Sequence, residues 1–104
     1  MLKVSVASGQ SGPVLVLAGE ADVTSVERLD QALDAQLAGQ AGQLTIDVTE
    51  LRYVDSAAMR ALMTAAMKAR AQDGGVTLLN PQPLVARMLD LLCADQVLSI
   101  RGGG

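Results

Sequence analysis

Hydrophobic and polar residues follow two different periods along this chain. In 3–7 and 44–48 apolar residues alternate with more polar ones, and 14–18 is apolar throughout. Alternation with a period of two is typical of a strand with one buried face. The glycine- and proline-containing segment 8–13 separates the first two stretches and predicts that they pair as an antiparallel hairpin.

Three other stretches repeat apolar residues at helical spacing. These stripes are Val26, Leu29, Leu33 and Leu37; Met59, Leu62, Met63 and Ala66; and Leu84, Met88, Leu91 and Leu92. Such spacing predicts helices with one buried face. Thr24 or Ser25 is predicted to cap the first helix, and Thr24 and Glu27 have the spacing of a capping box. Pro83 suits the first position of the last helix.

The order of these elements predicts one α/β domain over residues 1–101, followed by a flexible tail at 102–104. Short strands at 76–79 and 97–100 complete the order strand, strand, helix, strand, helix, strand, helix, strand. Strand–helix–strand units favour parallel pairing with right-handed crossovers. We therefore expect a small mixed β-sheet with an antiparallel opening hairpin, then parallel strands, and helices mainly on one face.

The segment 44–67 organises the chain. Its strand at 44–48 is followed by a polar connection at 49–54, and a helix over about 56–71 begins at Asp55–Ser56. A small oxygen-bearing side chain at a helix start can cap free backbone N–H groups. The positive end of the helix dipole also favours negative charge there. The Ser56 hydroxyl is therefore a candidate site for a phosphate or for a partner's polar group; the alternative is a simple cap.

Composition narrows the possible functions. The chain has 104 residues, no histidine and one cysteine, Cys93, which lies in an apolar run and is predicted to be buried. Without these ligands and bases we expect no metal site, no cofactor and no enzymatic activity. The net charge of −3 and the single aromatic residue, Tyr53, argue against nucleic-acid binding. No apolar run is long enough for membrane insertion or a signal peptide, which predicts a cytoplasmic protein.

Four motifs lie in a characteristic order along nearly the whole chain. They are GEAD at 19–22, IDVTEL at 46–51, VDSAA at 54–58 and VARMLDL at 85–91. In this order they resemble the STAS domain of bacterial anti-sigma factor antagonists. The resemblance implies a protein that binds an anti-sigma factor, commonly a serine kinase of the histidine-kinase-like ATPase type, and so releases a sigma factor for transcription. In that partner switching, phosphorylation of the antagonist breaks the complex.

The helix start departs from the usual motif of this family, in which an aspartate precedes two hydroxyl residues and a glycine. Asp55 and Ser56 match its first two positions, whereas the phosphoacceptor position holds Ala57 and the glycine position Ala58. Ser56 could take the phosphate instead, or the protein could bind its partner constitutively. A third possibility is a resemblance to the STAS subunit of bacterial phospholipid-trafficking ABC transporters, which carries a hydroxyl followed by alanine and holds the ATPase subunit.

The resemblance places a partner-binding surface at the start of this helix. Asp22 and Asp55 each follow a strand, and they would flank Ser56 if the two strand ends are adjacent. They could bind a partner's basic group or help to hold a kinase-bound magnesium ion, and they would repel a new phosphate; the alternative is that Asp22 only ends a strand. Helical geometry places Met59 and Met63 in the core. The predicted partner-binding residues are Asp22, Asp55, Ser56, Ala57, Arg60, Thr64 and Met67.

Overall fold

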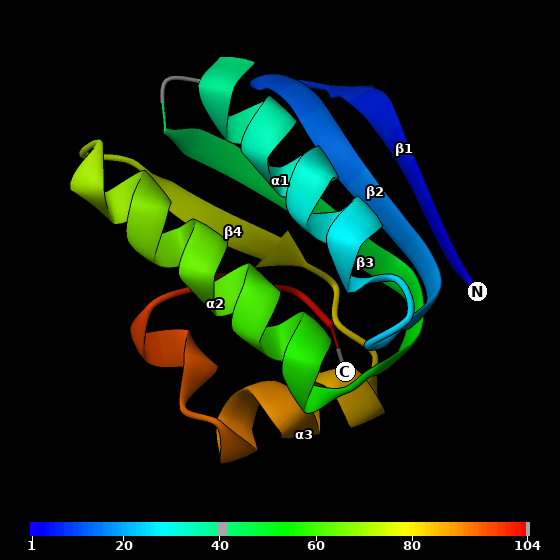
Figure 1. Cartoon of the computed structure of the whole chain (residues 1–104). Helices are drawn as coiled ribbons and strands as arrows, with labels where there is room; N and C mark the ends of the chain where they lie inside the picture. The colour runs from blue at the N-terminus through cyan, green and yellow to red at the C-terminus, as the bar shows by residue number, and fades with distance from the viewer. Residues whose placement is uncertain (40–41, 104) are drawn as a thin grey trace.

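The chain forms a sheet with helices packed against it (Figure 1). The computed structural model describes residues 1–39 and 42–103. Within them the elements are β1 (Leu2–Gly9), β2 (Gly12–Ala21), α1 (Val26–Gly39), β3 (Gln43–Val54), α2 (Ser56–Ala71), β4 (Gly75–Leu79), α3 (Pro83–Leu91), a 3-10 turn (Ala94–Gln96) and β5 (Ser99–Arg101).

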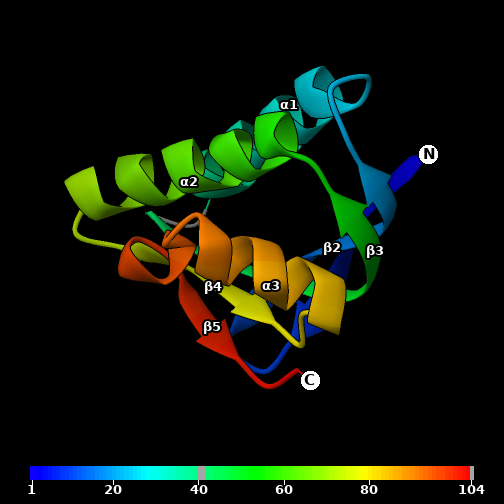
Figure 2. The same cartoon turned by 90° about the horizontal axis from the view of Figure 1, so that it is seen from below.

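The sheet is mixed, as the sequence predicts. Its strands lie in the order β1-β2-β3-β4-β5. β1 and β2 pair antiparallel, whereas β2 with β3, β3 with β4 and β4 with β5 pair parallel. Seen from below, α1 and α2 lie side by side above the sheet, and α3 packs against β3 (Figure 2). The predicted fold class is therefore confirmed.

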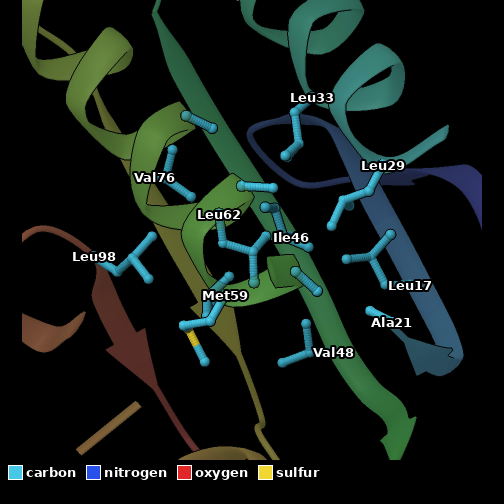
Figure 3. Packing of buried hydrophobic residues seen from close by; sticks show 14 of the residues in the cluster. Leu17, Ala21, Leu29, Leu33, Ile46, Val48, Met59, Leu62, Val76 and Leu98 are labelled. Atoms are coloured by element: carbon cyan, nitrogen blue, oxygen red, sulfur yellow. The ribbon is translucent and has the colours of Figure 1, made fainter. Parts of the chain in front are cut away.

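The core lies between the helices and the face of the sheet that they cover. Ile46 and Leu17 on the strands face Leu29 of α1 and Leu62 of α2, and all four side chains are at most 1% exposed (Figure 3). Full burial of one such side chain stabilises the fold by roughly 1.5–3 kcal/mol. Met59 is also fully buried, as predicted, whereas Met63, likewise predicted to lie in the core, is only half-buried and packs against it. These contacts fix where α2, and so its first residue, sits relative to the strand ends.

β3 is longer than its hydrophobic pattern predicts. The segment 49–54, predicted as a polar connection, continues the strand to Val54. Beyond Val48 the next buried residues are Leu51 and Val54, so the alternation stops. The pairing of β2 with β3 shifts register twice, between Val16 and Ala18 and between Gly19 and Glu20. Each shift inserts an extra residue into β3, which hides the period of two in the sequence.

Gly19, the first residue of the GEAD motif, lies at the second of these shifts. Its φ angle is +93°, a conformation that glycine adopts readily and other residues rarely. A Cβ atom at this position would lie only 2.2 Å from the backbone oxygen of Met1. The shape of the β2 backbone therefore requires glycine here.

The last helix presents a different face to the core from the one predicted. Val85 and Leu89 are the buried residues of α3, whereas Leu84 is 51% and Leu91 is 70% exposed. Apolar residues occupy both sides of this helix, so the spacing alone did not identify the buried side. Cys93, predicted to be buried, is exposed and has a left-handed backbone conformation just after the helix.

The end of the chain runs past β5 along the loop that precedes α3. Gly102 and Gly103 approach Asn80 and Pro81 closely. Of the predicted tail 102–104, Gly104 lies outside the described residues. Among the described helices, none is both long and apolar enough to cross a membrane.

Candidate partner-binding site

Two neighbouring strand ends bring the sequence-predicted residues together. Ala21, the last residue of β2, pairs with Val54, the last residue of β3. The backbone N–H of Asp55 donates a hydrogen bond to the backbone oxygen of Ala21, at 3.0 Å. Asp22 and Asp55 therefore follow adjacent parallel strands. The adjacency of the two strand ends was the condition on which the predicted site depended.

Asp55 is the N-cap of α2. Its Oδ1 accepts a hydrogen bond from the backbone N–H of Ala58 at 2.9 Å, and its Oδ2 accepts one from the backbone N–H of Val23 at 3.0 Å. The first bond satisfies a free donor of the helix start, and the negative charge lies at the positive end of the helix dipole. The second ties the helix start to the β2–α1 loop. Asp55 thus fixes the relative position of two segments of the site.

Asp22 organises the β2–α1 loop. Its Oδ1 accepts hydrogen bonds from the backbone N–H of Thr24, at 3.0 Å, and from the Thr24 hydroxyl. These bonds, above all the one from the Thr24 hydroxyl, lower the pKa of the Asp22 carboxyl below its ordinary value. The Thr24 hydroxyl therefore bonds to Asp22 and does not serve the predicted capping box. Ser25, which precedes α1, likewise bonds back to the main chain of Asp22.

Ser56 is the first residue of α2, and its side chain is exposed. Within the described part of the chain its hydroxyl has no hydrogen-bond partner. The capping role falls to Asp55, so the Ser56 hydroxyl is available to an external group. The next residue, Ala57, is half-buried and carries no oxygen that could accept a phosphoryl group.

A groove of about 320 Å³ runs along α2 from this point. Its lining residues are Ser56, Arg60, Met63, Thr64, Met67 and Leu92. We call it the α2 groove. Four of the predicted partner-binding residues line this groove: Ser56, Arg60, Thr64 and Met67. Asp22 lies in the β2–α1 loop, and Asp55 is the N-cap of α2. Three other hollows on the described surface are lined by none of the predicted residues.

The groove combines apolar side chains with one cation. Met67 is 62% and Leu92 is 41% exposed, and both line the same groove. Arg60 is exposed and makes no salt bridge with any described residue. Lys68, two turns further on, pairs instead with Asp34 of α1 at 3.2 Å. The groove therefore offers an apolar surface with an unneutralised guanidinium near the end that Ser56 occupies.

Sequence reasoning missed two residues of this surface. Leu92 belongs to the predicted core stripe of α3 but lies in the groove. Val23, in the β2–α1 loop, is 66% exposed and bonds to Asp55 through its backbone. The position of Val23 between the polar residues Asp22 and Thr24 could have indicated its exposure. No signal in the sequence indicated Leu92, because its position depends on how α3 packs beside α2.

The described residues contain no cluster of side chains arranged as metal ligands. No group of three or more cysteine, aspartate and glutamate side chains within them converges as metal ligands. Both oxygens of Asp55 accept backbone bonds, and Oδ1 of Asp22 is engaged by Thr24. These carboxylate oxygens therefore have structural roles within the fold.

The chain belongs to the STAS-domain family. A family model described as "Mlab, STAS domain" matches residues 4–100. No curated protein matches the sequence.

Solved structures show the same fold at low sequence identity. An anti-sigma factor antagonist from Mycobacterium paratuberculosis is 21% identical, with a TM-score of 0.85 over 97% of this chain and 86% of that chain. An anti-sigma-factor antagonist (STAS) domain protein from Planctomyces limnophilus is 16% identical, with a TM-score of 0.78 over 97% and 91%. The anti-sigma factor antagonist SpoIIAA in its unphosphorylated form is 18% identical, with a TM-score of 0.77 over 94% and 87%.

Proposed function

We propose that this chain is a non-enzymatic binding protein that holds an anti-sigma factor against the α2 groove and thereby releases a sigma factor. The observation that carries the proposal is the groove itself, in which exposed Met67 and Leu92 lie beside Arg60 and Ser56. Large apolar side chains exposed together on a small domain typically mark an interaction site. The fold shared with anti-sigma factor antagonists supports the choice of partner.

The chemistry of the groove defines the partner surface that would fit it. Met63, Met67 and Leu92 would receive apolar side chains, and methionine repacks readily around different shapes. Arg60 would pair with a carboxylate that the apolar contact shields from water. The Ser56 hydroxyl would bond to a polar group of the partner. A partner helix or loop with apolar residues next to an acidic one meets all three requirements.

Ser56 is also the proposed site of regulation. A phosphate would add about −1.5 to −2 charges at neutral pH. It would stand next to Asp55, whose carboxylate is fixed at the helix start, and in the groove that the partner covers. The added charge and bulk would expel the partner. Ala57 cannot take this role, because alanine has no hydroxyl.

A second candidate partner is the ATPase subunit of an ABC transporter. The specific observation in its favour is Ser56 followed by Ala57, since the transporter STAS subunit that the sequence resembles has a hydroxyl followed by alanine there. The same groove would hold the ATPase, and no phosphorylation switch would be needed.

Affinity capture with matched baits separates the two candidates. Wild-type protein and a Met67→Asp variant are used as baits in the native lysate, and only proteins lost with the variant count as groove partners. A soluble kinase-type anti-sigma factor in that set supports the proposal, and an ABC ATPase with membrane components replaces it with the second candidate. If both baits retain the same proteins, the groove is not the binding site.

Phosphorylation is tested with the captured partner. The purified chain is incubated with that partner and ATP, and its intact mass is measured beside that of Ser56→Ala. The proposed switch requires one added phosphate on the wild type and none on the variant. Phosphate on both proteins would assign the site elsewhere, and phosphate on neither would make the binding constitutive.

A further inference from the structure

The outer edge of the sheet is formed by β1, and no other helix or strand of the described chain lies along it (Figure 1). β1 has eight residues, whereas β5 at the opposite edge has three. An edge strand presents a row of unpaired backbone groups, which is a template for another strand. β1 is therefore the one long open edge among the described strands.

The hydrogen-bond pattern shows which backbone groups point outward. The N–H of Glu20 donates to the backbone oxygen of Met1, at 3.2 Å, so these residues form a hydrogen-bonded pair. In an antiparallel ladder such pairs recur at every second residue, and the register from Leu2 to Gly9 is unbroken. The residues whose N–H and C=O groups point away from β2 are then Leu2, Val4, Val6 and Ser8.

One contact supports this assignment. Arg28 of α1 donates from Nη2 to the backbone oxygen of Leu2, at 2.9 Å, as an outward carbonyl permits. No described residue bonds to the outward groups of Val4, Val6 or Ser8. The middle of the edge is therefore open, and only its beginning is capped.

Beyond Lys3, β1 lacks the features that protect natural edge strands. Such edges usually carry charges, prolines or bulges. From Val4 to Gly9 the strand contains none of these, and Lys3 is its only charged residue. Val6 is 54% exposed although it is apolar and β-branched, a residue type that packs well in a sheet.

We propose that β1 pairs antiparallel with β1 of a second copy, joining two sheets into one across a two-fold axis at Ser5. In this register Val4 lies opposite Val6 of the second copy, and the two outward-facing residues exchange both backbone bonds. Val4 packs on the core side of the sheet, so Val6 on the same side would extend that apolar surface across the interface. Lys3 lies opposite Ala7, and no like charges meet.

This self-complementarity favours a second copy over an unrelated strand. Each contact between residues of the two β1 strands occurs twice, once on each side of the axis, as a two-fold interface requires. Because β5 is too short to continue the pairing, assembly stops at two copies. The α2 groove remains open in both copies, since α1 lies between α2 and the β1 edge (Figure 1). The dimer would present two grooves.

Engineered cysteines test the register. In a Cys93→Ser background, Ser5→Cys places its thiol on the two-fold axis, where the Cα atoms of the two copies would be ~4.5 Å apart. That separation lies within the range of disulfides, about 4.4–6.8 Å. Ala7→Cys is the matched control, because it lies on the same face of β1 but ~14 Å from its own copy. We expect a disulfide-linked dimer from Ser5→Cys and little or none from Ala7→Cys.

Association without a cross-link is measured by analytical ultracentrifugation. The wild type should form a dimer as its concentration rises, and Val6→Lys should weaken association by about tenfold or more, equivalent to ~1.4 kcal/mol. Leu84→Lys, which changes an exposed leucine of α3 away from β1 and outside the α2 groove, should leave association unchanged. A wild type that is monomeric at millimolar concentration overturns the proposal. Equal cross-linking of the two cysteine variants overturns it too.

Discussion

The carboxylate of Asp55 accepts a hydrogen bond from the backbone N–H of Val23, at 3.0 Å, across 32 positions of sequence. Its other oxygen caps α2 through Ala58. A single side chain thus joins the helix that carries the α2 groove to the loop that follows β2. The aspartate of the family motif has a structural role here, and the neighbouring Ser56 hydroxyl is left available.

We predict that Asp55→Ala lowers the free energy of unfolding by about 1–2 kcal/mol, because the cap of α2 is lost. Asp55→Asn should lose less, since asparagine also caps helices well but offers one oxygen where the carboxylate offers two. Urea denaturation measures both changes. Amide hydrogen exchange should show faster exchange at Val23 in Asp55→Ala. A free energy unchanged by Asp55→Ala would contradict this role.

Gly19→Ala should destabilise the protein by roughly 1–3 kcal/mol, the usual cost of a non-glycine residue in a left-handed conformation. The new Cβ would also meet the Met1 oxygen. Gly39→Ala is the control, because a Cβ atom added at this helix end would meet no described atom within 4 Å outside its own helix and chain neighbours. There alanine should be neutral or stabilise by up to ~1 kcal/mol. Thermal or urea unfolding of the two variants should therefore give shifts that differ in size or sign.

The Asp22–Thr24 hydrogen bond predicts a pH dependence. The folded protein lowers the pKa of the Asp22 carboxyl, so its contribution to stability is present above the pKa of the unfolded chain. It is lost as the pH falls through the pKa of the folded state. Thr24→Val should therefore raise the pKa of Asp22 and destabilise the protein at neutral pH more than in acid. Carboxyl NMR titration measures the first effect and denaturation at several pH values the second.

An Asp22→Asn background provides the control for this prediction. With no carboxyl at position 22, the effect of Thr24→Val should no longer vary with pH in the acid range. A variation that persists in this background would assign it to another group.

The α2 groove predicts a separation of binding from stability. Met67→Asp should weaken partner binding by about tenfold or more, since it places a charge in the apolar part of the interface. Its side chain is 62% exposed, so the free energy of unfolding should change by less than about 0.5 kcal/mol. Leu84→Asp changes a similarly exposed residue of α3 outside the groove and should bind normally. Calorimetric titration of both variants against the captured partner checks the prediction, which an equal loss of affinity would refute.

Local sequence determined the start and face of α2. Asp55 is a preferred capping residue, and the alanine, leucine and methionine positions that follow repeat at 3.6 residues, so the helix at 56–71 and its buried residue Met59 could be predicted directly. The alternation in 44–48 identified the first part of β3 for the same reason. These features depend on interactions between residues that are close in the sequence, so they can be predicted from the sequence alone.

Tertiary structure decided the rest. The extension of β3 to Val54 depends on register shifts against β2, and the burial of Val85 in place of Leu84 depends on how α3 packs. The position of Leu92 in the α2 groove and the hydrogen bond between Val23 and Asp55 likewise depend on how distant segments pack together. In each case the sequence offered chemically equivalent alternatives. Only the position of a distant segment selected one of them, because the energy of burial or of a long-range hydrogen bond depends on what lies opposite.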